Sequence, residues 1–142
     1  MDIATVSDLT GLVLVAAIFG GMLFFALVVT PVIFTSLKPD VSGVLIRKMF
    51  PVYYLYMGVI SALATLTITF THEVDAVILP AVAGLLWVSR QLLMPRIDAV
   101  RDQKNAEDSG PATTSFKRLH RLSVVINLVQ LLAVLTVLVR IA

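Results

Sequence analysis

Polar side chains that could do chemistry share one face of the last apolar segment. Spacings of three and four residues place five side chains on this face of a helix: Phe116, His120, Ser123, Asn127 and Gln130. The imidazole of His120 could accept a proton or ligate a metal or a haem, or it could only bond a neighbouring helix. A polar stripe inside a bilayer is costly unless it faces protein or a wet cavity. We therefore expect this face to point into a helical bundle.

Arg90 is the second candidate, because it lies inside an apolar segment and no apolar segment contains an acidic partner. An arginine within the membrane suggests a functional site, with an anionic ligand or a lipid headgroup as partner. Alternatively, Arg90 lies five residues before Pro95, so its side chain could reach the headgroups by snorkelling. We predict a polar pocket in the cytoplasmic half of the bundle, with these ligand-binding residues: Thr30, Tyr54, Arg90, His120, Ser123 and Asn127.

The elements that position these residues follow from the composition of the chain. Its 142 residues are 58% apolar and only 14% charged, which is typical of a membrane protein and of one domain. Four apolar stretches approach the roughly 20 residues that span a bilayer: about 10–34, 52–70, 76–95 and 117–139. We predict an all-α integral membrane four-helix bundle that forms a single transmembrane domain over residues 1–142.

The connections between the spans predict the orientation of the bundle. Lysine and arginine gather in the segments 35–51 and 96–116 and just beyond, so these are expected to be cytoplasmic loops. Both termini would then face the outer, periplasmic side, most simply of a bacterial inner membrane. Within the first loop, Val41 to Phe50 is interpreted as an amphipathic lead-in that Pro51 separates from the second span. The start of the segment 96–116 is expected to extend the third helix into water.

Repeated spacings suggest that the chain contains two related helical hairpins. Pro31 and Pro95 are 64 residues apart, as are Gly20 and Gly84. A duplicated hairpin would explain these pairs. Apolar helices also align easily by chance, so both explanations stay open.

Two stretches resemble a known family. Thr30-Pro31-Val32-Ile33-Phe34, with Gly43 and Phe50-Pro51-Val52-Tyr53-Tyr54, is similar to its first signature, and Phe116 to Ser123 with Asn127 is similar to its last. The family is the bacterial transmembrane protein 205-like group, which is more distantly similar to copper-resistance D type membrane domains. The resemblance implies a small four-helix membrane domain of unknown function. Its eukaryotic relatives are associated with resistance to platinum drugs, which hints at transport or trafficking.

Three functions compete. The first is binding, or helping to move, a small molecule, ion or lipid through the polar pocket. The second is an accessory or assembly subunit of a larger membrane complex, and the third is a haem- or metal-binding electron-transfer subunit that uses His120. Haem would need His120 with a methionine or with a second chain, because His72 is expected on the opposite side of the membrane.

Other classes of function receive no support from the sequence. We expect no catalytic residue, because the chain has no nucleophile elbow, P-loop, dinucleotide fingerprint or paired carboxylates. The absence of cysteine removes thiolate metal sites, which leaves His120 as the one candidate metal ligand in the membrane. A net charge of +2 is too small to suggest nucleic acid. The expected partners are the lipid bilayer and a homodimer or larger membrane complex, and no cofactor is expected.

Overall fold

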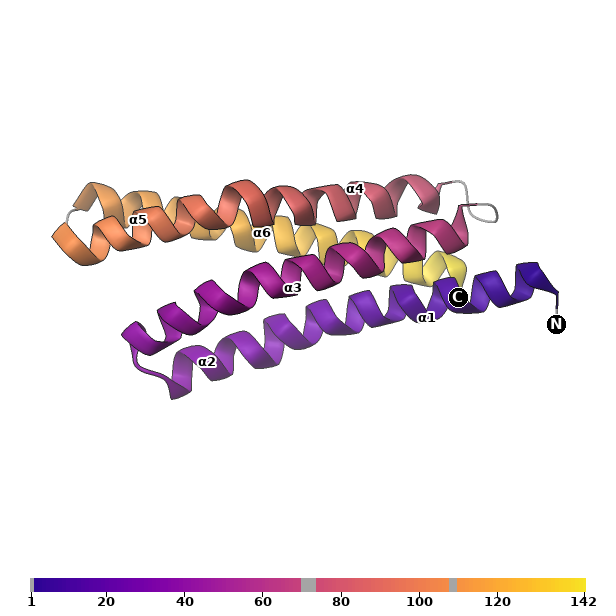
Figure 1. The fold of residues 1–142 in the computed structure, drawn as a ribbon, viewed down its shortest axis with the longest axis horizontal. Helices are drawn as coiled ribbons and strands as arrows, with labels where there is room; N and C mark the ends of the chain where they lie inside the picture. The colour runs from indigo at the N-terminus through magenta and orange to yellow at the C-terminus, as the bar shows by residue number, and fades with distance from the viewer. Residues whose placement is uncertain (1, 70–73, 108–109) are drawn as a thin grey trace.

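The computed structural model describes residues 2–69, 74–107 and 110–142, with only the backbone of Glu107 included. These residues form four long helical rods that run alternately up and down (Figure 1), and none of them is in a strand. The first and third rods each contain a five-residue π-helical turn. The elements are α1 (Ile3–Phe24), η1 (Phe25–Val29) and α2 (Thr30–Ser36), then α3 (Pro39–Ile68), then α4 (Asp75–Val88), η2 (Ser89–Leu93) and α5 (Met94–Glu107), and finally α6 (Gly110–Ile141). The expected all-α, four-helix architecture is confirmed.

Both π-helical turns end just before a proline. The amide of Thr30 donates to the carbonyl of Phe25, and the amide of Met94 donates to the carbonyl of Ser89. Proline has no amide hydrogen and crowds the preceding turn, and a π turn is a local rearrangement that accommodates such a disruption. The turns lie 64 residues apart, like Pro31 and Pro95. The two hairpins therefore share the same local distortion at corresponding positions.

The expected break at Pro51 is wrong, because α3 continues through this residue from Pro39 to Ile68. An interior proline removes one helical hydrogen bond and costs about 3 kcal/mol in an exposed helix. Here Ile46 and Tyr54, on either side of Pro51, are both buried and anchor the helix to the bundle. The segments 35–51 and 96–116, expected as loops, are mostly helical, and only Leu37 and Lys38 join α2 to α3. The extension of the third helix beyond Pro95 is confirmed by α5.

The helices pack most tightly at the end that holds the two termini. There α3 packs on α1 and α4, while α6 packs on α1 and α4. The core of this end consists mainly of apolar side chains with no exposed surface, including Ile18, Leu79, Leu86 and Val134. It also buries the polar side chains of Ser61, Asp75 and Gln130. This end of the bundle is therefore closed by side-chain packing.

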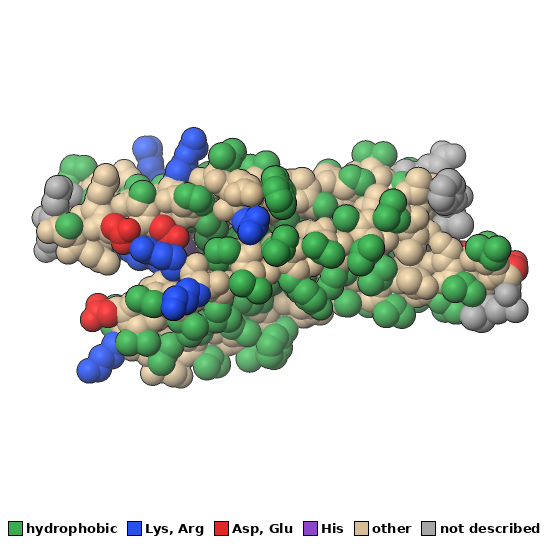
Figure 2. Space-filling model, viewed as in Figure 1, with side chains coloured by type: hydrophobic (Ala, Val, Ile, Leu, Met, Phe, Trp, Pro, Cys, Tyr) green, Lys and Arg blue, Asp and Glu red, His purple; other side chains and the backbone are tan. Residues whose placement is uncertain are grey.

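The outside of the bundle is apolar. Only 17% to 33% of the residues in the most apolar stretch of each rod are buried, and hydrophobic side chains cover the middle of the molecule (Figure 2). All four rods are long and apolar enough to cross a membrane. By length and composition, the chain is a multi-pass membrane protein.

Candidate functional site

A cavity of about 720 Å³ lies between the two hairpins at the end opposite the termini. At this end α2 and the start of α3 diverge from α5 and the start of α6 (Figure 1), and neither η1 nor α2 packs on α6. Charged side chains gather on either side of the gap (Figure 2). The cavity is therefore open at its mouth and closed toward the packed core.

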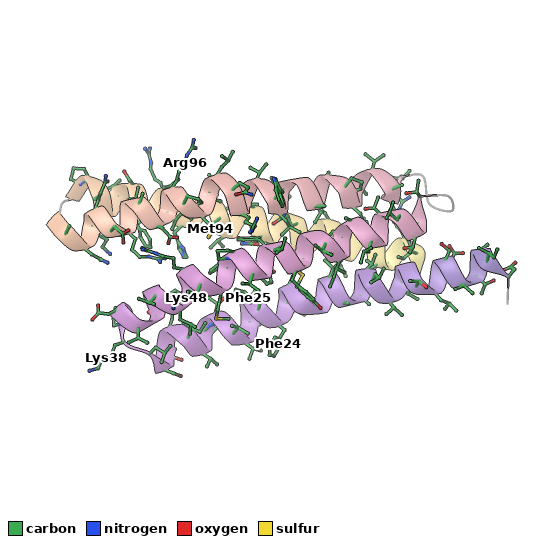
Figure 3. All side chains as sticks on the ribbon, viewed as in Figure 1. Phe24, Phe25, Lys38, Lys48, Met94 and Arg96 are labelled. Atoms are coloured by element: carbon green, nitrogen blue, oxygen red, sulfur yellow. The ribbon has the colours of Figure 1, made fainter. Side chains whose placement is uncertain are left out.

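Aromatic rings form one wall of the cavity. Phe25 of η1 stacks on Tyr53 of α3 with ring centroids 4.2 Å apart, and Phe50 meets Phe25 edge-on at 5.3 Å. The neighbouring Phe24 is exposed and points away from the bundle (Figure 3). The two neighbouring phenylalanines therefore point in different directions, Phe24 toward the outside and Phe25 toward α3. This wall is mainly aromatic.

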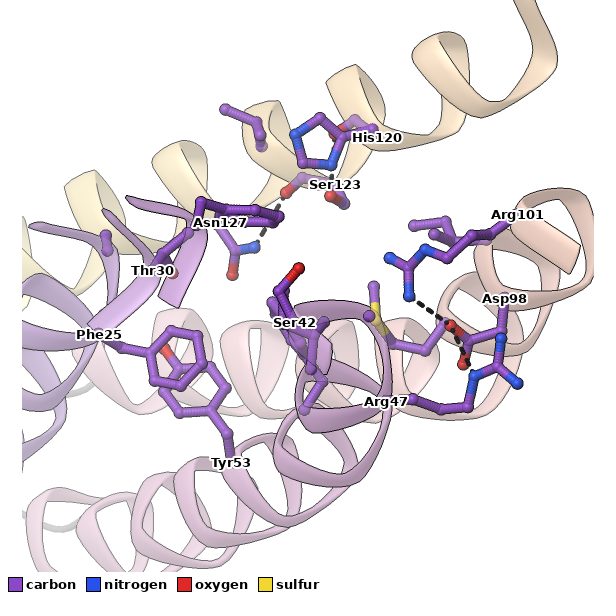
Figure 4. Close-up of a pocket in the computed structure, with 18 of the residues that line it drawn as sticks. Phe25, Thr30, Ser42, Arg47, Tyr53, Asp98, Arg101, His120, Ser123 and Asn127 are labelled. Atoms are coloured by element: carbon purple, nitrogen blue, oxygen red, sulfur yellow. Dashed lines mark hydrogen bonds and ion pairs between the residues drawn. The ribbon is translucent and has the colours of Figure 1, made fainter. Parts of the chain in front are cut away.

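Four of the six predicted site residues line the cavity together: Thr30, His120, Ser123 and Asn127 (Figure 4). The hydroxyl of Ser123 donates to the carbonyl of His120 at 2.9 Å, and the amide of Asn127 donates to the carbonyl of Ser123 at 3.0 Å. The ring of His120 stacks on Phe116 at 6.0 Å. One face of α6 therefore supplies most of the polar wall, and Thr30 supplies a hydroxyl from α2.

Tyr54 lies behind this wall and does not line the cavity. It is only 2% exposed, and its hydroxyl accepts a hydrogen bond of 3.4 Å from the Asn127 amide. This bond joins α3 to α6 across the bundle. Tyr54 positions Asn127 and has no contact surface of its own for a ligand in the cavity.

Arg90 also lies outside the cavity. Its Nε donates to the carbonyl of Pro51 at 3.2 Å, and its guanidinium sits 5.5 Å from the ring centroid of Trp87. The partner is therefore the backbone carbonyl of Pro51, within α3. Arg90 is half-buried and links α3 to η2. The sequence analysis predicts Arg90 in the pocket, and the structure places it outside.

Charged residues that the sequence interpretation missed surround the mouth. Arg47 of α3 pairs with Asp98 at 3.5 Å and with Asp102 at 2.6 Å, and Arg101 pairs with Asp98 at 3.3 Å. The hydrogen bond that Arg47 donates to the Asp102 carboxylate raises the pKa of the Arg47 guanidinium above its ordinary value. Asp98, Arg101 and Asp102 have helical spacing in a segment expected to extend the third helix, but this spacing does not reveal their pairing with Arg47 on another helix.

A cluster of cationic and aromatic side chains completes the mouth. The Arg101 guanidinium and the Lys104 ammonium lie 5.5 Å and 5.4 Å from the ring centroid of Phe116, on which His120 stacks. All four residues line the cavity. Among the described residues, Lys104 forms no ion pair.

The described residues contain no group of three or more histidine, cysteine or acidic side chains placed to hold a metal ion. His72, which is expected on the opposite side of the membrane from His120, lies outside the described residues. The lining of the cavity combines hydroxyl, amide and imidazole groups with cations and with the carboxylates of Asp40 and Asp98.

Comparison with curated proteins and comparison with solved structures give no match. A family model does match, over residues 13–106, and its description is Domain of unknown function (DUF4149). The matched region runs from α1 to α5 and includes the aromatic wall, Thr30 and the charged mouth of the cavity. With most of its length matched, the chain belongs to the DUF4149 family.

Proposed function

We propose that this protein binds a small molecule, ion or lipid in the cavity between its two hairpins. The observation that carries the proposal is that the polar groups of Thr30, Ser123 and Asn127 line the same space of about 720 Å³. That volume lies within the range of about 300–1,000 Å³ that is usual for ligand sites. A mainly apolar lining with a few convergent polar groups is also typical of such sites.

Binding is favoured over conduction by one chain alone. The cavity ends at a packed core, in which Ile18, Leu86 and Val134 have no exposed surface. A transported ligand would need the hairpins to separate along that core or would need a second chain. The bundle therefore supports a binding role, with help in transport as a wider form of the same proposal.

We further propose that the mouth faces the cytoplasm of a bacterial cell, with the protein in the inner membrane. The excess of lysine and arginine at this end supports this orientation, which places both termini on the periplasmic side. The matching π turns support an origin by duplication of one hairpin. The resemblance to the transmembrane protein 205-like group, and more distantly to copper-resistance D type domains, is consistent with a small four-helix domain in that membrane.

The test is native mass spectrometry of the protein in mild detergent, with a variant that fills the cavity. Thr30→Trp places a large ring in the cavity, and Thr136→Trp makes the same change at an exposed site near the closed end. We expect a bound species on the wild type and on Thr136→Trp, and its loss from Thr30→Trp. A wild type that carries nothing, or equal retention by both variants, would refute the binding role.

A role as an accessory subunit is the second candidate. Gly20 is exposed, and a side chain added there would meet nothing within 4 Å, so with Ala16 it leaves a smooth, unpacked strip on α1. Small residues in such strips let membrane helices approach closely. Loss of a co-purifying protein on Gly20→Val, with the cavity ligand retained, would favour this second function.

A further inference from the structure

The cavity opens sideways as well as at its mouth. Leu27 of η1 and Leu128 of α6 both line it, and they are also 66% and 54% exposed on the outside of the bundle. The backbones of η1 and α6 do not come close together, so these two leucines border a gap between the first and the fourth rod. The gap lies within the apolar surface of the molecule, so it connects the cavity to the region that the lipid chains occupy.

The end of the bundle that holds the mouth carries an excess of positive charge. The cations Arg47, Arg101 and Lys104 line the cavity with the carboxylates of Asp40 and Asp98, and Asp102 beside the lining pairs with Arg47. Because Arg47 and Arg101 share Asp98 while Lys104 forms no ion pair among the described residues, Lys104 is the cation most available to a ligand. Nine of the 11 basic residues of the chain belong to this end: Lys38, Arg47, Lys48, Arg96, Arg101, Lys104, Lys117, Arg118 and Arg121.

This field favours an anion over a cation at the mouth. The two cations over Phe116 and the adjacent His120 ring form a compact set of hydrogen-bond donors next to the apolar floor. Lysine and arginine are the usual partners of phosphate groups. A ligand that matches both the cations at the mouth and the apolar floor of the cavity has an anionic group at one end and a hydrocarbon chain at the other.

We propose that the cavity holds an acidic phospholipid taken from the surrounding bilayer. Its phosphate lies at Arg101, Lys104 and His120, and an acyl chain leaves between Leu27 and Leu128. This assignment rests on the proposed binding function and names the class of ligand. It also explains why the polar wall is short, since only the headgroup region needs hydrogen bonds.

The test uses protein that has been stripped of lipid in a neutral detergent. It is then mixed with phosphatidylglycerol, phosphatidylcholine or glycerol phosphate, and the bound species are counted by native mass spectrometry. We expect retention of phosphatidylglycerol and little of the other two. Lys104→Gln should weaken phosphatidylglycerol binding about tenfold, the equivalent of one charge-assisted hydrogen bond.

Two matched controls separate the site from general effects. Lys48→Gln removes an exposed charge at the same end but outside the cavity, and it should bind phosphatidylglycerol as the wild type does. Leu128→Trp narrows the side opening and should also weaken binding. Leu132→Trp, at an exposed position one turn further along α6 and outside the cavity, should not.

Each alternative result has a separate meaning. Equal retention of phosphatidylcholine, or full binding by Lys104→Gln, would overturn the anionic headgroup while leaving a binding cavity in place. If glycerol phosphate, which has no acyl chain, is retained as strongly as phosphatidylglycerol, the acyl chain does not contribute to binding and the side opening is overturned. If none of the three probes is retained and Thr30→Trp resembles the wild type, the proposed function fails as well.

Discussion

Arg47 of α3 and Asp98 of α5 lie 3.5 Å apart and join the two hairpins at the mouth of the cavity. Arg101 donates to the same Asp98 carboxylate at 3.3 Å, from the same helix. Arg47 also pairs with Asp102 of α5 at 2.6 Å. These ion pairs therefore link the two hairpins across the mouth.

Removal of this link should widen the mouth with little change in stability. Arg47 is 44% exposed, and exposed ion pairs contribute at most about 1 kcal/mol. The chain has no cysteine, so spin labels at Val44→Cys and Gln103→Cys report the distance between α3 and α5 cleanly. We expect Arg47→Gln to lengthen and broaden that distance and Lys48→Gln to leave it unchanged. The same distribution in both variants would mean that the pair does not hold the hairpins together.

Arg90 should matter for stability and leave ligand binding intact. Arg90→Leu loses the hydrogen bond to the Pro51 carbonyl and the contact with Trp87, at a cost of about 1 kcal/mol. Arg90→Lys keeps a charge near Trp87 and should lose less. Thermal unfolding in detergent measures the cost, and native mass spectrometry measures the bound species. Loss of the bound species from Arg90→Leu would return Arg90 to the site.

Neighbouring glycines of α1 should respond differently to the same substitution. A side chain at Gly21 would collide with the end of Met57 on α3, whereas Gly20 faces open space. We expect Gly21→Val to cost about 1 kcal/mol, at the low end of overpacking costs, because the flexible end of Met57 must move aside. Gly20→Val should stay within about 0.5 kcal/mol. Unfolding curves of the two variants provide the comparison. Equal changes in the two variants would show that the Met57 contact does not decide the outcome.

Removal of either partner of the ion pair at the closed end should cost a different amount of stability. Asp75 of α4 is 1% exposed and lies 3.0 Å from the Nε of Arg140, which is about half exposed. Arg140→Gln leaves a buried carboxylate without its cation, which costs about 1–3 kcal/mol. Asp75→Asn leaves a cation that water can still reach, so it should cost less. Thermal unfolding decides the order, and a larger loss for Asp75→Asn would contradict it.

The sequence was sufficient for the part of the site that lies on one uninterrupted helix. His120, Ser123 and Asn127 belong to α6, and regular spacing along that helix brings them to one cavity. Arg90 shows the limit of such reasoning. Its depth followed from the sequence, but its direction depends on the π turn Ser89–Leu93, which regular helical spacing does not reveal.

The mouth was missed for a different reason. The sequence predicts helical character on both sides of the mouth, in the lead-in Val41 to Phe50 and in the extension of the third helix beyond Pro95, and α3 and α5 contain these segments. It does not predict which charged side chains of the two helices meet. Tertiary contacts such as Arg47 with Asp98 cannot be inferred from spacing along one segment.

The π turn Phe25–Val29 also changes the phase of the first rod. It inserts one residue without adding a turn, so α2 is rotated by about 100° relative to an uninterrupted continuation of α1. A helical wheel drawn at constant pitch from Gly11 therefore gives the wrong side-chain direction for Thr30 and for the residues of the first rod that follow it. Deletion of one residue from this turn would restore the phase and swing the Thr30 hydroxyl out of the cavity wall.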